Sequence, residues 1–297
     1  MSMDFKGKTA VITGAGSGFG LALARLCAQE GMNLVLADVQ ADALDRANQE
    51  FAGVPHLSQR LDVSSGAEMA TLAAAVQQRF GAPHLVFNNA GVAFGGLLWE
   101  ASEADWDWVM GVNLRGVVHG VRLFTPMMLA AAKADPLYRG HIVNTASMAG
   151  VLNPPLSGPY NVSKHAVVSL SETLHHDLAL VTEQVHCSVL CPYYVPTGIA
   201  DSHRNRDPGT MTRATASQRV SHAMAQKAVS SGKLSAEDIA AMVLASVREQ
   251  RFWIFSHPHA LEGLLRNAED QVRGLNPADP FAAMPELNAQ IRGALRA

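Results

Sequence analysis

The sequence predicts a doubly wound α/β fold, in which a parallel sheet of about seven strands carries helices on both faces. Short runs rich in β-branched residues alternate along the chain with longer runs of helical periodicity. The first of these short runs leads into a glycine-rich turn and then into a helical segment. Alternating strands and helices joined by right-handed crossovers build such a sheet.

The expected strands are 9–13, 33–38, 57–61, 84–88, 140–145, 185–191 and 252–256. The expected helices fill the gaps at 18–30, 41–51, 66–80, 103–132, 159–182 and 235–249. Residues 198–233 are polar and mixed and break this alternation, and the tail 257–297 predicts two short helices at 257–273 and 285–296. The length fits one large domain, 1–297, with an insertion at 198–233 and a C-terminal extension at 257–297.

Composition narrows the class of protein. The 48% apolar residues suffice for a sizeable core, and a formal net charge of −3 argues against nucleic acid as a partner. The three cysteines form no Cys-x-x-Cys pattern, which favours buried, reduced thiols in a cytoplasmic protein. The N-terminus has no apolar signal core and no apolar run could span a bilayer, so no membrane contact is expected. His257-Pro-His259 has a chelating spacing but no accompanying carboxylate or cysteine pattern, so no metal is expected.

The glycine-rich turn predicts a dinucleotide site. The strand-like Lys8–Thr13 leads into Gly14-Ala-Gly-Ser-Gly18-Phe-Gly20 and then into a helical run. Glycines permit a tight turn and let a pyrophosphate approach the backbone, while the helix N-terminus offers unpaired N–H groups to that anion. This context is typical of a Rossmann fold. The expected cofactor contacts here are Gly14, Ser17, Gly18, Phe19 and Gly20.

Asp38 ends the second expected strand and predicts which dinucleotide binds. A carboxylate at this point can accept hydrogen bonds from both hydroxyls of the adenosine ribose, and it would repel a 2′-phosphate. The positions where NADP sites usually carry Arg or Lys are Val39 and Ser17, both uncharged. The sequence therefore favours NAD as the cofactor.

Tyr160 and Lys164 predict an acid-base catalyst. They lie four residues apart at the start of an expected helix and so share one face. A phenol titrates near about 10, and a neighbouring ammonium would lower that pKa towards neutrality. Ser147, thirteen residues before Tyr160, offers a hydroxyl that could hold a substrate oxygen. Taken alone, Tyr-x-x-x-Lys is also an ordinary helix face, but the dinucleotide motif upstream favours the catalytic interpretation.

Together these segments resemble the short-chain dehydrogenase/reductase family over about residues 6–256. The motifs occur in the family's order, as Thr13-Gly14-x-x-x-Gly18-x-Gly20, Asp62-Val63, Asn88-Asn89-Ala90-Gly91, Asn113-Leu-Arg-Gly116, Ser147 and Tyr160-x-x-x-Lys164. The resemblance implies that Tyr160 is the proton donor or acceptor and that Ser147 positions the substrate oxygen. It implies that Lys164 also holds the nicotinamide ribose and that Asn113 holds a water linking Lys164 to solvent. The cofactor contacts that it adds are Asp62, Val63, Asn89, Ala90 and Gly91.

One motif departs from the family pattern. The sequence Cys191-Pro192-Tyr193-Tyr194-Val195-Pro196-Thr197 has Tyr193 where the family usually has glycine. Pro192, Val195 and Thr197 are still expected to contact the cofactor. Because glycine gives backbone freedom that tyrosine lacks, the sequence does not determine the path of this loop. The two tyrosines are expected at the pocket wall or at the hinge of the following segment.

The resemblance implies that 198–233 forms a helical lid over the substrate. Its basic residues outnumber Asp201 and Asp207, and they are Arg204, Arg206, Arg213, Arg219, Lys227 and Lys233. Such a lid could recognise an anionic substrate or a carrier phosphate, and the alternative is a solvated helix face.

The expected substrate contacts are apolar or aromatic, and they are Phe94, Met148, Leu152, Tyr193, Tyr194 and Ile199. This lining favours a medium to bulky hydrophobic ketone or secondary alcohol, processed by an NAD-dependent alcohol dehydrogenase. Phe124–Met128 and Trp106–Gly111 resemble bacterial short-chain dehydrogenases that act on aryl alcohols. The alternatives are a carrier- or CoA-linked 3-oxoacyl reductase and a non-catalytic dinucleotide-binding protein. In similar proteins 103–132 and 159–182 form the subunit seam, which implies a homotetramer or homodimer.

Overall fold

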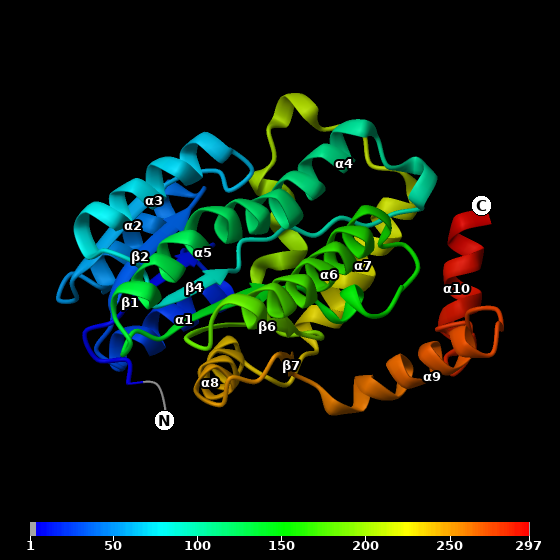
Figure 1. Cartoon of the computed structure of the whole chain (residues 1–297). Helices are drawn as coiled ribbons and strands as arrows, with labels where there is room; N and C mark the ends of the chain where they lie inside the picture. The colour runs from blue at the N-terminus through cyan, green and yellow to red at the C-terminus, as the bar shows by residue number, and fades with distance from the viewer. Residues whose placement is uncertain (1–3, 297) are drawn as a thin grey trace.

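The computed structural model describes residues 4–296 and has a seven-stranded parallel sheet at its centre (Figure 1). The sheet order is β3-β2-β1-β4-β5-β6-β7, and every neighbouring pair is parallel. The order reverses between β1 and β4, which makes the carboxyl ends of these strands the expected ligand site. The strands are β1 Thr9–Thr13, β2 Asn33–Asp38, β3 His56–Arg60, β4 Leu85–Asn88, β5 Gly140–Thr145, β6 Val185–Cys191 and β7 Trp253–Phe255.

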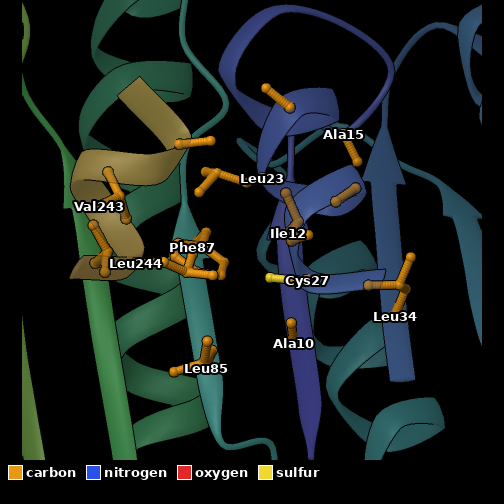
Figure 2. Close-up of a cluster of buried hydrophobic side chains, with 14 of the residues drawn as sticks. Ala10, Ile12, Ala15, Leu23, Cys27, Leu34, Leu85, Phe87, Val243 and Leu244 are labelled. Carbon is orange, nitrogen blue, oxygen red and sulfur yellow. The ribbon is translucent and has the colours of Figure 1, made fainter. Parts of the chain in front are cut away.

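Helices cover both faces of the sheet because successive strand residues point to opposite sides. Helices α1 Gly18–Gln29, α2 Ala41–Glu50 and α8 Ala236–Arg248 pack on the face that carries Ile12 and Phe87. Figure 2 shows Ile12 projecting from β1 and Phe87 from β4, with Leu23 and Cys27 of α1 and Val243 and Leu244 of α8 in the same core cluster. The opposite face carries Val11 and is covered by α3 Gly66–Phe80, α5 Gly116–Ala134 and α6 Gly158–Val181.

The predicted fold class is confirmed, and each strand lies within one residue of its expected bounds. One expected helix, 103–132, is wrong. It is divided into α4 Glu103–Met110, a π-helical turn at Gly111–Arg115 and α5. Within that turn Asn113 is fully buried and bonds the backbone of Val92, so a tertiary contact accounts for the widened turn.

The insertion and the tail are both largely helical. Residues 198–233 form two short 3₁₀ segments, Gly198–Asn205 and Pro208–Thr210, and then α7 Ala216–Ser230. The tail begins with a 3₁₀ turn at Pro258–Ala260, continues as α9 Leu261–Val272 and ends in α10 Pro285–Arg296, which contacts α7. Figure 1 shows α9 and α10 at the edge of the molecule, far from α2 and α3.

The structure can be compared with two inferences from composition, which concern the cysteines and membrane-spanning segments. All three cysteines, Cys27, Cys187 and Cys191, are buried and free of disulfides, as expected. Within residues 4–296, no helix combines the length and hydropathy that a bilayer-crossing segment needs.

Candidate active site

A cavity of about 1710 Å³ opens at the carboxyl ends of the strands. Single-ligand pockets usually measure roughly 300–1,000 Å³, so this one has room for a dinucleotide and a second molecule. Of the predicted site residues, only Gly20 and Asn113 lie outside its lining. The others line it, namely Gly14, Ser17, Gly18, Phe19, Asp38, Asp62, Val63, Asn89, Ala90, Gly91, Phe94, Ser147, Met148, Leu152, Tyr160, Lys164, Pro192, Tyr193, Tyr194, Val195, Thr197 and Ile199.

The turn after β1 needs its glycines. Gly14 and Gly18 have φ values of 68° and 52°, a region that side chains disfavour. A Cβ on Gly20 would lie 2.0 Å from the carbonyl oxygen of Gly14, so only glycine fits there. Ser17 caps α1 without a side-chain hydrogen bond, which leaves the first N–H groups of the helix available to an anion.

Thr13 ties this turn to the loop after β4. Its Oγ1 accepts hydrogen bonds from the backbone N–H groups of Asn89, at 2.9 Å, and Ala90, at 3.1 Å. The Asn89 side chain returns a bond to the Thr13 carbonyl at 2.9 Å. Thr13 is therefore a positioning residue that sequence reasoning placed in the motif but did not select for the site.

Asp38 lies where the sequence predicts it and also supports the glycine turn. Its Oδ2 accepts from the Gly16 N–H at 2.8 Å and its Oδ1 from the Gln40 N–H at 2.9 Å. A carboxylate has about four acceptor sites, so both oxygens keep capacity for ribose hydroxyls. The residues present therefore fit a dinucleotide whose ribose carries no 2′-phosphate.

Three of the four predicted catalytic residues come from β5 and α6 or the loop between them. Ser147 follows β5, while Tyr160 and Lys164 lie one turn apart at the start of α6. Lys164 is buried, its Nζ lies 5.7 Å from the centroid of the Tyr160 ring, and it donates to the Thr145 carbonyl at 2.9 Å. A phenol, a hydroxyl and a buried ammonium thus line one end of the cavity, as proton transfer to a substrate oxygen requires.

The protonation of this group differs from the sequence expectation. Burial raises the pKa of the Tyr160 phenol above its ordinary value, and a hydrogen-bonding interaction with Ser147 acts in the opposite direction. The expected lowering of that pKa by Lys164 is wrong for this arrangement, in which the ammonium donates to Thr145 instead. Burial lowers the pKa of Lys164 to about 8. Tyr160 is therefore held as a neutral acid near pH 7.

The buried Lys164 predicts how the stability of the free protein depends on pH. Its pKa is about 8 in the fold and 10.5 in the ordinary state, so the unfolded chain binds more protons between these values. The sign follows from linkage: the free energy of unfolding contributed by Lys164 increases as the pH rises from about 8 to about 10.5. We expect the wild type to gain stability over this window relative to Lys164→Met, measured by urea unfolding. Parallel pH curves for the two proteins would contradict the burial of this ammonium.

Asn113 stands behind the catalytic group rather than at the cavity wall. Its Nδ2 donates to the Val92 carbonyl at 3.0 Å and to Ser163 Oγ at 3.1 Å, and its Oδ1 accepts from the Val92 N–H. A Cβ on Gly91 would lie 3.4 Å from Asn113 Oδ1 and 3.5 Å from Lys164 Nζ, so both atoms approach the same glycine. The water-holding role of Asn113 stays a prediction.

The two tyrosines after β6 connect the cavity to the C-terminal extension. The Tyr193 ring lies 4.4 Å from that of Tyr194, and 5.8 Å and 5.9 Å from the rings of His257 and His259, centroid to centroid. The Tyr193 N–H donates to Ser256 Oγ at 3.0 Å. Tyr193 therefore lines the cavity and also packs against the start of the extension, which accounts for an aromatic residue where the family usually has glycine.

Residues of the segment 198–233, the expected lid, line the cavity, and polar contacts hold the segment to the rest of the protein. Arg206 forms an ion pair with Asp105 in α4, with side chains only 8% and 2% exposed, and its guanidinium lies 5.5 Å from the Trp108 ring centroid. Ser202 Oγ accepts from the Ala93 N–H at 2.8 Å, and Asn205 bonds the Gln40 side chain.

These contacts weaken the interpretation that the basic residues of 198–233 recognise an anionic substrate or a carrier phosphate. Arg206 is paired with Asp105, Arg204 donates to the Gly198 carbonyl at 2.8 Å and Arg219 donates to the Ala214 carbonyl at 2.6 Å. Of the lid's remaining cations, Arg213 and Lys233 lie outside the cavity lining, whereas Lys227 lines it. Three of the six basic residues of this segment therefore bond to groups of the segment or of α4.

Sequence reasoning missed the contribution of the extension. His259 and several residues of α9, among them Glu262 and Arg266, line the cavity, although no motif marks them. Sequence reasoning also considered only His257-Pro-His259 as a chelating pair. Within residues 4–296, the ligand-type side chains that come together are instead Asp201, His203 and His222, which are exposed on the lid.

Three comparisons place this geometry among known proteins. A family model described as short chain dehydrogenase matches residues 8–208. A solved short-chain dehydrogenase/reductase from Burkholderia phymatum, in complex with NAD, has a TM-score of 0.90 and 50% identity and covers 94% of this chain and 99% of its own. A C alpha-dehydrogenase of Sphingobium sp. is 31% identical over 96% of this chain and 93% of its own length. A 3-oxoacyl-acyl-carrier-protein reductase of Thermotoga maritima is 30% identical over 67% of this chain and 78% of its own length.

Proposed function

The chain belongs to the short-chain dehydrogenase/reductase family, and from that premise we propose that it is an NAD(H)-dependent alcohol dehydrogenase or ketoreductase. Its substrate is a medium to bulky, hydrophobic or aromatic secondary alcohol or the corresponding ketone. One observation carries the proposal: Tyr160, Lys164 and Ser147 line the same cavity as Asp38 and the glycine turn. Acid-base groups and a ribose-binding carboxylate serve one reaction only when they share a site.

The residues divide the reaction between them. When bound, the dinucleotide supplies or accepts the hydride. Asp38, the glycine turn and Lys164 would hold the dinucleotide. Ser147 would hold the substrate oxygen. In ketone reduction, Tyr160 gives its phenolic proton to the oxygen as the carbonyl carbon becomes a carbinol carbon. In alcohol oxidation the proton passes from the alcohol oxygen back to Tyr160, whose ring centroid lies 5.7 Å from the Lys164 ammonium.

The lining of the cavity supports the substrate class. Met148, Leu152, Tyr193, Tyr194 and Ile199 present apolar or aromatic surface to it. The similarity to a C alpha-dehydrogenase over almost the whole chain supports a dehydrogenase reaction. The NAD complex of the Burkholderia phymatum relative supports the choice of dinucleotide.

The choice of NAD over NADP can be tested at Asp38. We expect the wild type to bind NADH more tightly than NADPH, because the carboxylate accepts ribose hydroxyls and repels a 2′-phosphate. The double substitution Asp38→Ser with Val39→Arg should shift the ratio of the two Kd values towards NADPH by at least about tenfold, the value of a hydrogen bond to a charged group. Fluorescence titration measures both constants.

Asp45→Ser is the matched control, because it removes the same charge from an exposed position of α2 outside the cavity. It should leave the ratio unchanged. Equal or tighter binding of NADPH by the wild type would overturn the assignment.

The alternatives have less support. A carrier- or CoA-linked 3-oxoacyl reductase agrees with one relative, but three of the lid's six cations bond to groups of the protein itself. A non-catalytic dinucleotide-binding protein would not need Asn113, Ser147, Tyr160 and Lys164 together. We further propose a cytoplasmic homodimer or homotetramer assembled through α5 and α6, the two long helices that form the subunit seam in similar proteins.

A further inference from the structure

Two histidines and one aspartate come together in the segment 198–233. One ligand atom from each side chain lies within 4.8 Å of the other two, and we call these residues the histidine cluster: Asp201, His203 and His222. Asp201 and His203 belong to the 3₁₀ segment Gly198–Asn205, whereas His222 belongs to α7. No local motif contains all three residues, so sequence reasoning predicts no metal here.

The separation of Asp201 and His222 matches that of two ligands on one zinc ion. Asp201 Oδ1 lies 3.4 Å from His222 Nε2. Zinc binds such atoms at about 2.0–2.2 Å in tetrahedral geometry, which places two of them roughly 3.3–3.6 Å apart. The His203 ring lies edge-to-face with the His222 ring, with centroids 5.7 Å apart. Because the three side chains are exposed, a fast rotamer change can bring the third ligand atom to the same separation.

Buried serines hold the backbone beside both histidines. Ser202 precedes the first histidine, is 2% exposed and accepts from the Ala93 N–H at 2.8 Å. Ser221 precedes the second, is 9% exposed and donates to the Leu156 carbonyl at 2.8 Å. The two imidazoles therefore project from backbone positions that the rest of the protein fixes, as a preorganised site requires.

The carboxylate of the cluster is oriented from α7. Gln226 Nε2 donates to Asp201 Oδ1 at 3.2 Å. Gln226 lies one turn beyond His222, so the helix that supplies one ligand also orients another. Hydrogen bonds of this kind to a ligating carboxylate are usual in metal sites and increase their affinity.

The donor atoms select the class of ion. Two imidazoles and one carboxylate suit zinc and similar transition metals, whereas Mg²⁺ and Ca²⁺ prefer oxygen ligands. Three protein ligands leave the fourth tetrahedral position to water. The side chains of Asp201 and His222 are 54% and 43% exposed, which leaves room for that water and a route for the ion. The cluster therefore has the composition of a three-ligand zinc site.

We propose that the histidine cluster is a zinc-binding site that joins the 3₁₀ segment Gly198–Asn205 to α7. Both elements contribute to the wall of the cavity, which His203 and His222 line. Between the two elements lie the exposed residues 211–214, which form neither helix nor strand. A bound ion restricts the local opening of this connection, because the ion must dissociate before the two elements separate.

The first experiment measures zinc binding to the untagged protein without cofactor, by calorimetric titration with Zn²⁺. We expect the wild type to bind one equivalent at the cluster, and Mg²⁺ not to compete. His222→Ala and Asp201→Asn should each weaken binding by at least about 10–100-fold, the loss that follows even removal of a group that only hydrogen-bonds to a metal ligand. Both positions are exposed, so the variants should fold as the wild type does.

His176→Ala is the matched control. It removes an exposed histidine whose ring lies 5.5 Å from that of His175, a separation similar to that in the cluster. Within residues 4–296 no third ligand joins this pair, so the zinc affinity of the control should equal that of the wild type. Equal affinity of the wild type and His222→Ala would overturn the site. A loss confined to His257→Ala would also overturn it, because the ion would then lie on His257-Pro-His259.

The second experiment asks whether the ion joins the two elements, and it follows tryptic cleavage after the exposed Arg213. Zn²⁺ at about 100 times its Kd should slow this cleavage by up to about a hundredfold, because it favours the closed form by that factor. The rate in His222→Ala should not depend on zinc, which also corrects for any effect of zinc on trypsin. Zinc binding that leaves the wild-type rate unchanged would refute the proposed connection between the 3₁₀ segment and α7.

Discussion

Replacing Tyr160 by Phe should lower kcat for ketone reduction by roughly 10²–10⁴-fold, the usual contribution of a general acid. The phenol is held protonated near pH 7 because burial raises its pKa, and it lines the same end of the cavity as Ser147. Phe keeps the ring beside Lys164 and removes only the proton that the substrate oxygen must receive. Because Lys164 and the glycine turn remain, the Kd of NADH should change little.

Steady-state kinetics and NADH fluorescence titration separate these two effects. Tyr138→Phe is the matched control, because it removes a buried phenol hydroxyl that bonds the Pro83 carbonyl outside the cavity. This control should lose some stability and keep its turnover. Turnover close to that of the wild type in Tyr160→Phe would remove Tyr160 from the mechanism.

The sequence predicts the sheet well because its signals are local. Each strand is a short apolar run, and Gly14 to Gly20 mark a turn that only glycine can make, since a Cβ on Gly20 would lie 2.0 Å from a carbonyl oxygen. The carboxyl ends of parallel strands meet at one edge of the sheet. The residues after β1, β2, β4, β5 and β6 therefore had to converge there, and all but two of the predicted site residues line one cavity.

The parts that sequence reasoning missed depend on contacts between distant segments. The widened turn around Asn113 follows from its bonds to the Val92 backbone, 21 residues away. The pKa of Tyr160 is raised by burial, which depends on the packing of the whole cavity, and Lys164 donates to the Thr145 carbonyl, 19 residues away. No local pattern in α9 indicates that residues of this helix line the cavity, because that depends on the contacts of the C-terminal extension with Tyr193, Leu152 and α7.

The ion pair of Arg206 and Asp105 is another contact between distant segments. Breaking it should have a large effect on stability and on the KM for the ketone. In the sequence Arg206 is one of six lid cations, whereas in the fold it joins the lid to α4 with almost no exposure. Removing one partner of a buried pair usually costs about 3–5 kcal/mol, because the other charge stays buried and unpaired. We expect Arg206→Leu to lose stability of that order, measured by urea unfolding, and to raise the KM for the ketone.

A double substitution separates the buried charge from the closure of the lid. Asp105 also accepts from the N–H and hydroxyl of Ser102, the N-cap of α4, and Asn at position 105 can keep such a bond. Asp105→Asn with Arg206→Leu should therefore recover most of the stability, since no unpaired charge remains. The KM should stay high, because the lid has still lost its attachment to α4. Arg204→Leu, which removes an exposed lid cation bonded to Gly198, should leave stability within about 0.5 kcal/mol of the wild type. A double variant no more stable than Arg206→Leu would mean that the pair contributes through packing on Trp108 rather than through charge.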